Sequence, residues 1–192
     1  HAPVTNRILD SLEANGGRAT FFMVGNRVTG KANKAAVTRM AALGCEVANH
    51  TYEHKAITKL GAEGIKSQLA RANDSIRLAG GVSPVLMRPP GGAKSDAAMK
   101  TVGSMGMSAV LWSIDTLDWK TKNKQKTIDA VIGHVKDGDI VLMHDLYGTT
   151  ADAAEVIIPK LKEMGFQLVT VSELASYRGG IQPGKVYSRF RP

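Results

Sequence analysis

The sequence predicts an α/β fold in which strands and helices alternate along one domain. Six short apolar runs rich in β-forming residues are separated by segments whose apolar residues recur at helical spacing. The length of 192 residues suits a single domain, and 43% hydrophobic with 22% charged residues excludes wholesale disorder and fibrous repeats. Such alternation favours parallel strands joined by crossover helices, as in a barrel or a doubly wound sheet.

The expected strands are short and end at glycines or polar residues. They cover 19–24, 46–48, 85–88, 109–114, 140–143 and 166–171. No run of about 18 apolar residues occurs, so we expect no transmembrane segment.

The expected helices lie before and between these runs. They cover 3–14, 37–43, 65–76, 95–105, 126–135 and 151–164, the last with a possible kink at Pro159. Gly44, Gly106 and Gly165 follow three of the helices, where a left-handed cap is expected.

The two ends of the chain depart from this alternation. An α/β chain normally starts on a strand, but the first element here is a helix, so we expect a strand to be missing before His1. Six strands are also few for a barrel, whose usual length is roughly 250 residues. The alternation stops after Leu174, which predicts a main domain over 1–177 and a basic C-terminal tail over 178–192.

The charge and the cysteine content restrict the partners. Lys and Arg number 25 against 17 Asp and Glu, a net charge of +8 that favours polyanionic surroundings. The strip formed by Lys120, Lys122, Lys124 and Lys126 has no interleaved aromatic residues, so we interpret it as a solvated loop and expect no nucleic-acid partner. Cys45 is the only cysteine, which excludes an internal disulfide and predicts a small buried side chain.

Polar residues follow four of the expected strands. Parallel strands place their carboxyl ends at one edge, where α/β proteins carry their sites. The four polar segments are 49–54, 88–92, 115–119 and 144–145.

His50 and His54 are four residues apart. On a helical turn after the strand both imidazoles would project from one side and could bind one metal ion. Catalytic zinc usually has three protein ligands, so a third is needed. It could come from Asp115, Asp118 or Asp145, or from outside this sequence. Two histidines in a surface loop are the alternative.

The polar segments after the remaining strands contain a candidate ion-pairing arginine and a candidate general acid. Arg88 precedes two prolines that hold an extended backbone, which suits a buried pair with a carboxylate. Asp118 and His144 have the composition of a carboxylate that orients an imidazole acting as general acid, with a capping Asp and a core His as alternatives. Trp119 could form an apolar wall for a sugar ring, or belong to the core.

Taken in order, segments 50–54, 88–92, 115–119 and 142–144 resemble the second to fifth motifs of the polysaccharide deacetylases. This is the NodB-homology group, or carbohydrate esterase family 4, and the likeness is greatest to peptidoglycan N-acetylglucosamine deacetylases. The resemblance covers 1–174. It implies a distorted (β/α) barrel of seven or eight units, a divalent metal ion and hydrolysis of acetyl groups on polysaccharides.

The resemblance also implies residue roles. His50 and His54 would bind the metal, Arg88 would pair with the general base, and Asp118 would tune His144 as the general acid. The backbone N–H of Gly91, where the family often has tyrosine, would contact the oxyanion. The residues that would contact the substrate are Trp119, Leu142 and Pro89.

The family's first motif, which carries the base and the third metal ligand as adjacent aspartates, is absent from this chain. In relatives it precedes a helix like the one expected over 3–14. We infer a cleaved or truncated product, and we expect the upstream fragment as a partner.

The leading functional hypothesis is a metal-dependent N-deacetylase acting on peptidoglycan, with zinc preferred over cobalt, nickel or manganese. The resemblance implies an extracellular or cell-surface location in bacteria. Chitooligosaccharide deacetylase and acetylxylan esterase are alternatives within the same chemistry. A non-catalytic glycan-binding domain and a polyanion-binding module are alternatives outside it.

Overall fold

The computed structural model describes residues 2–192 and has parallel strands surrounded by helices. Five strands form one sheet in the order β1-β2-β3-β4-β7, and β5 and β6 form a second. Every pair of neighbouring strands in these sheets is parallel. The expected α/β class is therefore confirmed, with the strands arranged as a distorted barrel.

The strands are short. They span β1 Thr20–Met23, β2 Glu46–Asn49, β3 Leu86–Met87, β4 Ser108–Val110, β5 Ile114–Asp115, β6 Val141–Leu142 and β7 Val186–Tyr187. The register pairs Phe21 with Val47 and Met87 with Ala109. The carboxyl ends of β1 to β4 consequently meet at one edge of the larger sheet.

Helices follow most of the strands, together with three short 3₁₀ turns. The helices span α1 Ala2–Ala14, α2 Gly30–Ala42, α3 Ala62–Gly80, α4 Asp96–Ser104, α5 Asp118–Thr121, α6 Lys124–Val131, α7 Gly148–Glu163 and α8 Val171–Ser176. The turns are η1 Gly25–Arg27, η2 Ile57–Lys59 and η3 Pro90–Gly92. α7 continues through Pro159 without interruption.

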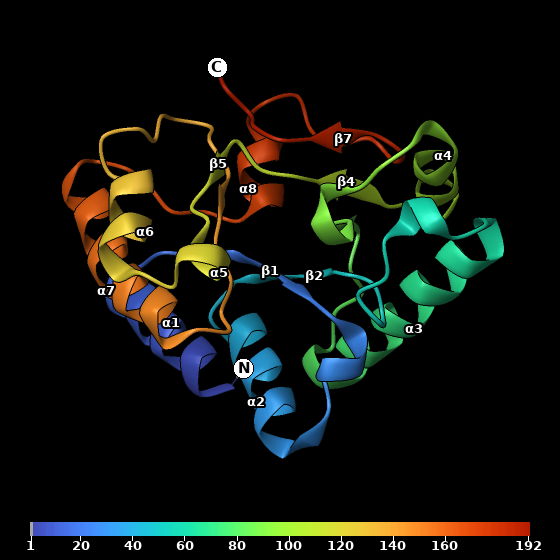
Figure 1. The fold of residues 1–192 in the computed structure, drawn as a ribbon, viewed down its shortest axis with the longest axis horizontal. Helices are drawn as coiled ribbons and strands as arrows, with labels where there is room; N and C mark the ends of the chain where they lie inside the picture. Colours follow the sequence, from blue (N-terminus) through green and yellow to red (C-terminus); the bar gives the residue numbers. More distant parts are fainter. Residues whose placement is uncertain (1) are drawn as a thin grey trace.

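The helices surround the strands on three sides in Figure 1, with α1, α6 and α7 on one side, α2 below, and α3 and α4 on the other. One apolar cluster lies under α1, α2 and α7 and contains Leu9, Met40 and Val47. A second joins α3 and α4 to β3 and β4 through Leu69 and Met87. Burial of these side chains, worth about 1.5–3 kcal/mol each when complete, fixes the helices against the sheet.

Local capping sets several helix starts. The Ser95 hydroxyl accepts from the Ala98 amide at 3.2 Å, and Asn123 Oδ1 accepts from the Lys126 amide at 2.9 Å. Gly44, as expected after a helix, has φ +74°, a left-handed conformation that favours glycine.

Two expected strands differ in the structure. The run 109–114 is split between β4 and β5 because the Val110 and Leu111 carbonyls accept hydrogen bonds from the Arg88 guanidinium. The run 166–171 forms no strand. There, Thr170 and Glu173 form a capping box that starts α8.

The segment 178–192 is also more than the expected tail. Its strand β7 pairs with β4, and the Phe190 side chain is buried with Ile140 and Val110. The polar and basic composition of 178–192 favoured a tail, whereas in the structure this segment supplies the edge strand β7 of the larger sheet.

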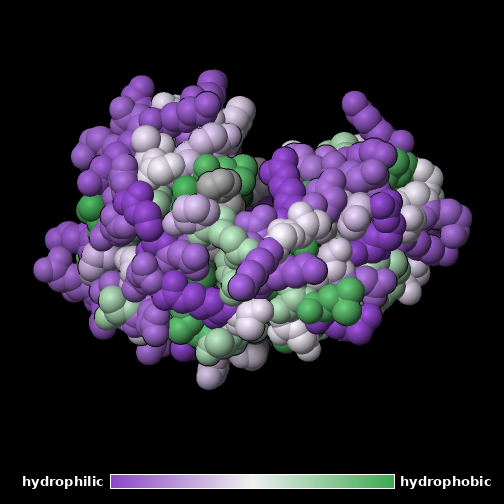
Figure 2. Space-filling view, turned by 90° about the horizontal axis from the view of Figure 1, so that it is seen from below, coloured by the Kyte–Doolittle hydropathy of each residue, from purple (hydrophilic) through white to green (hydrophobic). Residues whose placement is uncertain are grey.

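The outer surface is mainly hydrophilic. Figure 2 shows one face on which apolar side chains form separate small patches and the surface is hollowed along its upper edge. Across residues 2–192, none of the helices combines the length and apolar character needed to cross a bilayer.

Candidate active site

His50 and His54 lie in the loop that follows β2. This loop is not the helical turn considered from the sequence, since Thr51 and His54 have φ +62° and +58°. The two imidazoles nevertheless meet, with ring centroids 4.8 Å apart and planes at 68°. Left-handed conformations at non-glycine residues cost free energy, and such strain is common where side chains must be aimed.

Both histidines have the protonation that a metal ligand requires. Burial lowers the pKa of His50 to about 3, and burial followed by the Arg27 charge lowers that of His54. His50 Nδ1 lies 2.6 Å from the Arg88 carbonyl oxygen, so this nitrogen carries the proton and Nε2 has the free lone pair. Two neutral imidazoles side by side are donors that suit zinc, cobalt and nickel.

A third acidic or sulfur ligand is not assembled here. Across residues 2–192, no group of three or more His, Cys, Asp or Glu side chains is arranged to hold a metal. Asp115 accepts from the Leu117 amide, Asp118 is occupied by His144, and Asp145 accepts from the Thr5 hydroxyl. The hypothesis that one of these three aspartates completes the set is therefore wrong for the described residues.

Arg88 is buried immediately beside the histidine pair. Its guanidinium donates to the carbonyls of Val110 and Leu111 at 3.0 and 2.9 Å and lies 4.1 Å from the centroid of the Phe22 ring. Burial lowers the pKa of Arg88 to about 9. It forms no ion pair with any carboxylate in the described part of the chain, so the expected pairing stays a prediction.

The turn after Arg88 exposes a backbone donor. Pro89 is buried and precedes η3, in which Gly91 has φ +65° and faces open space. Among residues 2–192 the Gly91 N–H has no hydrogen-bond acceptor. The Gly92 N–H, in contrast, donates to the Pro89 carbonyl at 2.9 Å. The expected contact of the Gly91 N–H with the oxyanion stays a prediction.

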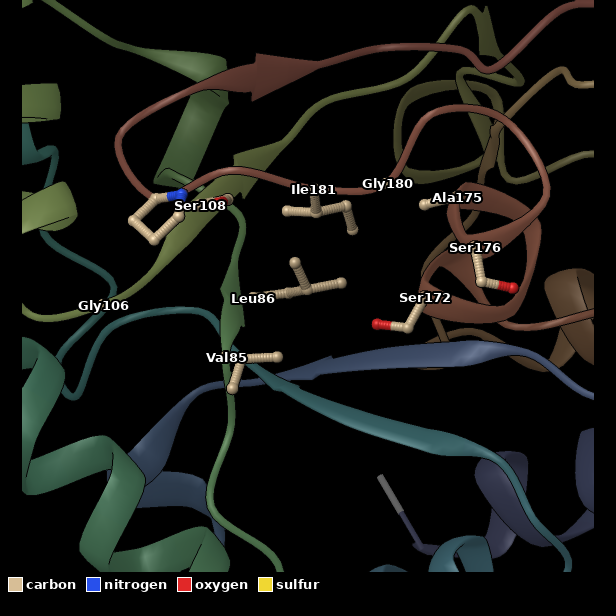
Figure 3. A pocket seen from close by; sticks show the side chains of 10 residues that line it. Val85, Leu86, Gly106, Ser108, Ser172, Ala175, Ser176, Gly180 and Ile181 are labelled. Atoms are coloured by element: carbon tan, nitrogen blue, oxygen red, sulfur yellow. The ribbon is translucent and has the colours of Figure 1, made fainter.

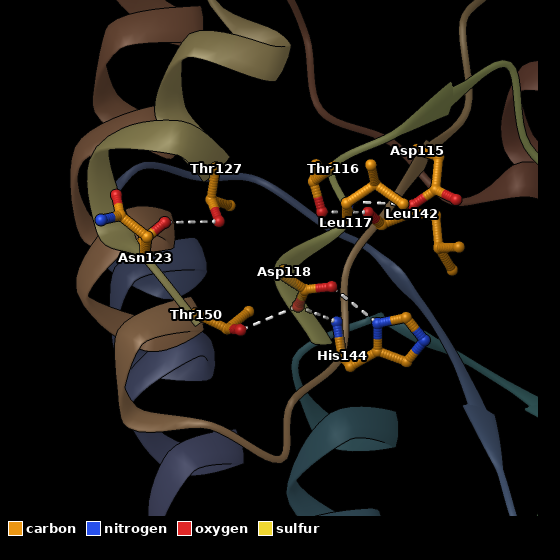
Figure 4. Close-up of polar contacts among 9 residues, drawn as sticks. All are labelled: Asp115, Thr116, Leu117, Asp118, Asn123, Thr127, Leu142, His144 and Thr150. Carbon is orange, nitrogen blue, oxygen red and sulfur yellow. Dashed lines mark hydrogen bonds and ion pairs between the residues drawn. The ribbon is translucent and has the colours of Figure 1, made fainter. Parts of the chain in front are cut away.

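Asp118 is buried and holds the half-buried His144 through several hydrogen bonds (Figure 4). Asp118 Oδ1 lies 2.7 Å from His144 Nδ1, and Oδ2 accepts from the His144 amide at 2.7 Å and the Thr150 hydroxyl at 2.8 Å. Burial raises the pKa of Asp118, but the hydrogen bonds from His144 and Thr150 outweigh it, and the net shift is downward. The ionised carboxylate holds the Nδ1–H tautomer and leaves His144 Nε2 directed away.

The two pairs share one electrostatic environment. A positive charge on His144 lowers the pKa of both His50 and His54. β2 supplies the loop with His50, and β6 supplies His144 just beyond its end. The carboxyl ends of strands from both sheets therefore converge on this site.

The other predicted contact residues differ in exposure. Trp119 is 48% exposed on α5, next to Asp118. Leu142 is 6% exposed, and its carbonyl accepts from the Thr116 hydroxyl at 2.8 Å. Trp119 can present an apolar face to a ligand, whereas Leu142 and Pro89 offer little surface.

Sequence reasoning missed the residues that hold the histidine loop. Gln68 Oε1 accepts from the amides of Tyr52 and Glu53 at 3.1 and 2.8 Å, and Gln68 Nε2 donates to Glu53 Oε2 at 2.6 Å. Asn49 Oδ1 accepts from the Thr51 amide at 2.7 Å. A buried glutamine on an otherwise apolar helix face was the available signal.

A second hollow lies at the opposite ends of the strands (Figure 3). Its lining comes from the starts of β3 and β4, from α8 and from the segment before β7. The lining residues are Val85, Leu86, Gly106, Ser108, Ser172, Ala175, Ser176, Gly180, Ile181 and Pro183. The hydroxyls of Ser108 and Ser172 are bonded to Gln182 and Glu46, so this hollow offers no reactive group.

Fold and site together define a (β/α)-barrel protein with a histidine-rich centre at the carboxyl ends of its strands. Residues 2–110 match the family model for polysaccharide deacetylases. The chain belongs to the polysaccharide deacetylase family.

Three comparisons illustrate this membership. The chain is 42% identical over 170 residues to the peptidoglycan-N-acetylmuramic acid deacetylase PdaC of Bacillus subtilis, covering 88% of this chain and 35% of that protein. It is 34% identical to the peptidoglycan-N-acetylglucosamine deacetylase PgdA of Listeria monocytogenes, covering 96% and 38%. A family 4 acetyl xylan esterase from Clostridium thermocellum, solved with a cobalt ion, superposes with a TM-score of 0.89 at 30% identity, covering 98% and 93%. The chain thus spans about a third of the length of these two curated relatives.

Proposed function

We propose that this chain is the catalytic part of a metal-dependent hydrolase that removes N-acetyl groups from N-acetylglucosamine in peptidoglycan. The observation that carries the proposal is the hydrogen bond between the buried Asp118 and the half-buried His144, in the same site as two neutral histidines. The peptidoglycan deacetylases among its relatives support the substrate.

His144 would act as the general acid. An amide nitrogen leaves very poorly as an anion, so it must receive a proton as the C–N bond breaks. Asp118 fixes the ring through Nδ1 and stabilises the charged imidazolium, so Nε2 can deliver that proton. The attacking water must lose its own proton, and the described residues contain no carboxylate poised beside the histidine pair for this task.

Two further groups would act on the acyl carbon. The Gly91 N–H would donate to the carbonyl oxygen as negative charge develops there. His50 and His54 would hold a divalent ion, with zinc preferred over cobalt, nickel or manganese, which when bound supplies Lewis acidity. Trp119 would place its exposed face against a sugar ring, with Leu142 and Pro89 behind the acetyl group.

Related substrates share this chemistry. Chitooligosaccharides carry the same N-acetyl group, and acetylxylan carries an ester whose alcohol leaves more easily. The close superposition with an acetyl xylan esterase favours the ester as a second candidate.

A non-catalytic glycan-binding domain is a candidate of another class. It is favoured by the two-histidine donor set and by the Arg88 cation, which has no carboxylate partner among residues 2–192. The names of the bacterial peptidoglycan relatives support a location outside the cell or at its surface.

Acetate release decides between these functions. Because the described residues supply neither the base nor a third metal ligand, the protein is mixed with a segment that carries the two adjacent aspartates of the family's first motif. The mixture is loaded with Zn²⁺ and incubated with peptidoglycan, chitooligosaccharides and acetylated xylan. We expect acetate to be released from peptidoglycan and a chelator to stop this release. Adding Zn²⁺ back should restore acetate release by the wild type but not by the His50→Ala variant. No acetate from any substrate, with glycan binding retained, would favour the binding domain.

A further inference from the structure

A dense basic segment lies directly against the acid pair. The nine residues 118–126 contain four lysines, at positions 120, 122, 124 and 126, and one acid, the buried Asp118. All four lysines are exposed, and none takes part in an ion pair within residues 2–192. The excess positive charge is therefore available to a ligand.

Lys122 is held at a defined position. Its amide donates to the Asp118 carbonyl at 2.9 Å, and its φ of +45° is left-handed. Its ammonium lies 5.1 Å from the centroid of the Tyr147 ring, and Tyr147 follows His144 by three residues. The backbone bond to Asp118 and the cation–π contact with Tyr147 thus hold Lys122 between the two segments that carry Asp118 and His144.

Apolar side chains lie next to the lysines. Trp119, Leu117 and Leu146 are 48%, 40% and 41% exposed and flank the same stretch of α5 and the start of α7. Cations beside exposed apolar surface suit a ligand that combines carboxylates with sugar rings.

We propose that Lys120 and Lys122 bind carboxylate groups of an acidic glycan strand, next to the sugar presented to His144. The inference rests on the proposed function and adds to it a subsite for the carboxylates that peptidoglycan carries on its lactyl groups and peptides. Nucleic acid fits less well, because the Lys122 ammonium occupies a face of the Tyr147 ring and Trp119 alone offers a free stacking surface on this segment.

Binding to insoluble polymers tests this surface without requiring turnover. Wild type, Lys120→Gln with Lys122→Gln, and the matched control Lys160→Gln with Lys162→Gln are sedimented with peptidoglycan over a range of NaCl concentrations. The control removes the same formal charge at the far end of α7, about 20 Å from Tyr147 at 1.5 Å per residue. It also removes the exposed Lys160–Glu163 ion pair, which contributes little to stability. Equal melting temperatures show that the variants are folded.

We expect the Lys120/Lys122 variant to bind peptidoglycan roughly 3- to 10-fold more weakly at low salt, with a smaller salt dependence and unchanged binding to neutral chitin. The control variant should bind as the wild type does. Removing teichoic acids from the peptidoglycan should leave this difference in place, since the ligands are carboxylates and not phosphates.

Three results would overturn the proposal. They are equal weakening by the control pair, loss of the difference once teichoic acids are removed, and tighter binding to duplex DNA that depends on the same two lysines. If the binding difference holds but no substrate releases acetate, the proposed function fails and the binding surface stands.

Discussion

Asp118 binds His144 at two points, the ring Nδ1 through one carboxylate oxygen and the backbone amide through the other, both at 2.7 Å. The backbone contact fixes where His144 leaves β6, and the ring contact fixes which nitrogen faces outward. Thr150 donates to the same carboxylate at 2.8 Å, so α7 takes part in positioning the acid.

Replacing Asp118 by Asn should lower kcat for amide hydrolysis with little change in KM. Asn keeps the size of the side chain but loses the charge that stabilises the imidazolium, and its NH₂ group can select the wrong tautomer. General acid catalysis contributes roughly 100- to 10,000-fold, and we expect a loss of that order in acetate release. Asp129→Asn, at an exposed aspartate on α6, is the control. A loss below threefold in Asp118→Asn would show that Asp118 does not support general acid catalysis by His144.

Acid should remove the stabilisation that Asp118 provides. Its pKa is lowered in the folded state from 3.8, so the carboxylate stabilises the fold fully above that pH. As the pH falls from 3.8 through the folded-state pKa, the unfolded chain takes up the proton more readily and the stabilisation is lost. Urea unfolding of wild type and Asp118→Asn at pH 6 and pH 3 measures this. The difference in free energy of unfolding should shrink at pH 3, and a constant difference would contradict the shift.

Gln68 should control metal affinity although it touches no metal. Gln68→Met keeps the volume but leaves the Tyr52 and Glu53 amides without their acceptor, which loosens the loop between the histidines. Residues that support metal ligands typically change affinity roughly 10- to 100-fold, and we expect the lower end for Co²⁺ in calorimetric titration. Gln125→Met, on the surface of α6, should bind as the wild type does. Unchanged affinity in Gln68→Met would show that the loop holds its shape unaided.

Alanine should be tolerated better at Gly91 than at Gly92. Both have left-handed backbones, with φ +65° and +68°. A Cβ at Gly91 meets nothing within 4 Å, so Gly91→Ala should cost only the backbone strain, about 1 kcal/mol. At Gly92 it would lie 3.1 Å from the Trp112 ring and add a steric cost. Thermal unfolding of both variants tests this order, and Gly91→Ala should still release acetate because its N–H remains.

The most reliable predictions from the sequence came from the spacing of apolar residues and from the position of polar residues after the strands. Apolar runs located β1, β2, β3 and β6, and helical spacing located α1, α3, α4 and α7. Polar residues after strands located both the histidine pair and the Asp118–His144 pair, because parallel strands bring their carboxyl ends to one edge.

The backbone conformation of the histidine loop and several long-range contacts could not be predicted from the sequence. The left-handed Thr51 and His54 are not glycines, so propensity alone does not reveal their loop. Neither does it reveal that Arg88 takes the carbonyls that would extend β4. The capping box at Thr170 was readable, but the apolar run before it resembled a strand.

The close contact between Phe190 and Gly138 has a consequence for self-association of the protein. The Phe190 amide donates to the Gly138 carbonyl at 2.7 Å, and a Cβ at Gly138 would lie 2.2 Å from the Phe190 carbonyl oxygen, so only glycine allows this contact. It secures β7 along β4, whose backbone would otherwise present open donors and acceptors to other chains. Deleting the C-terminal residues should therefore cause aggregation before it alters the site around His50 and His54.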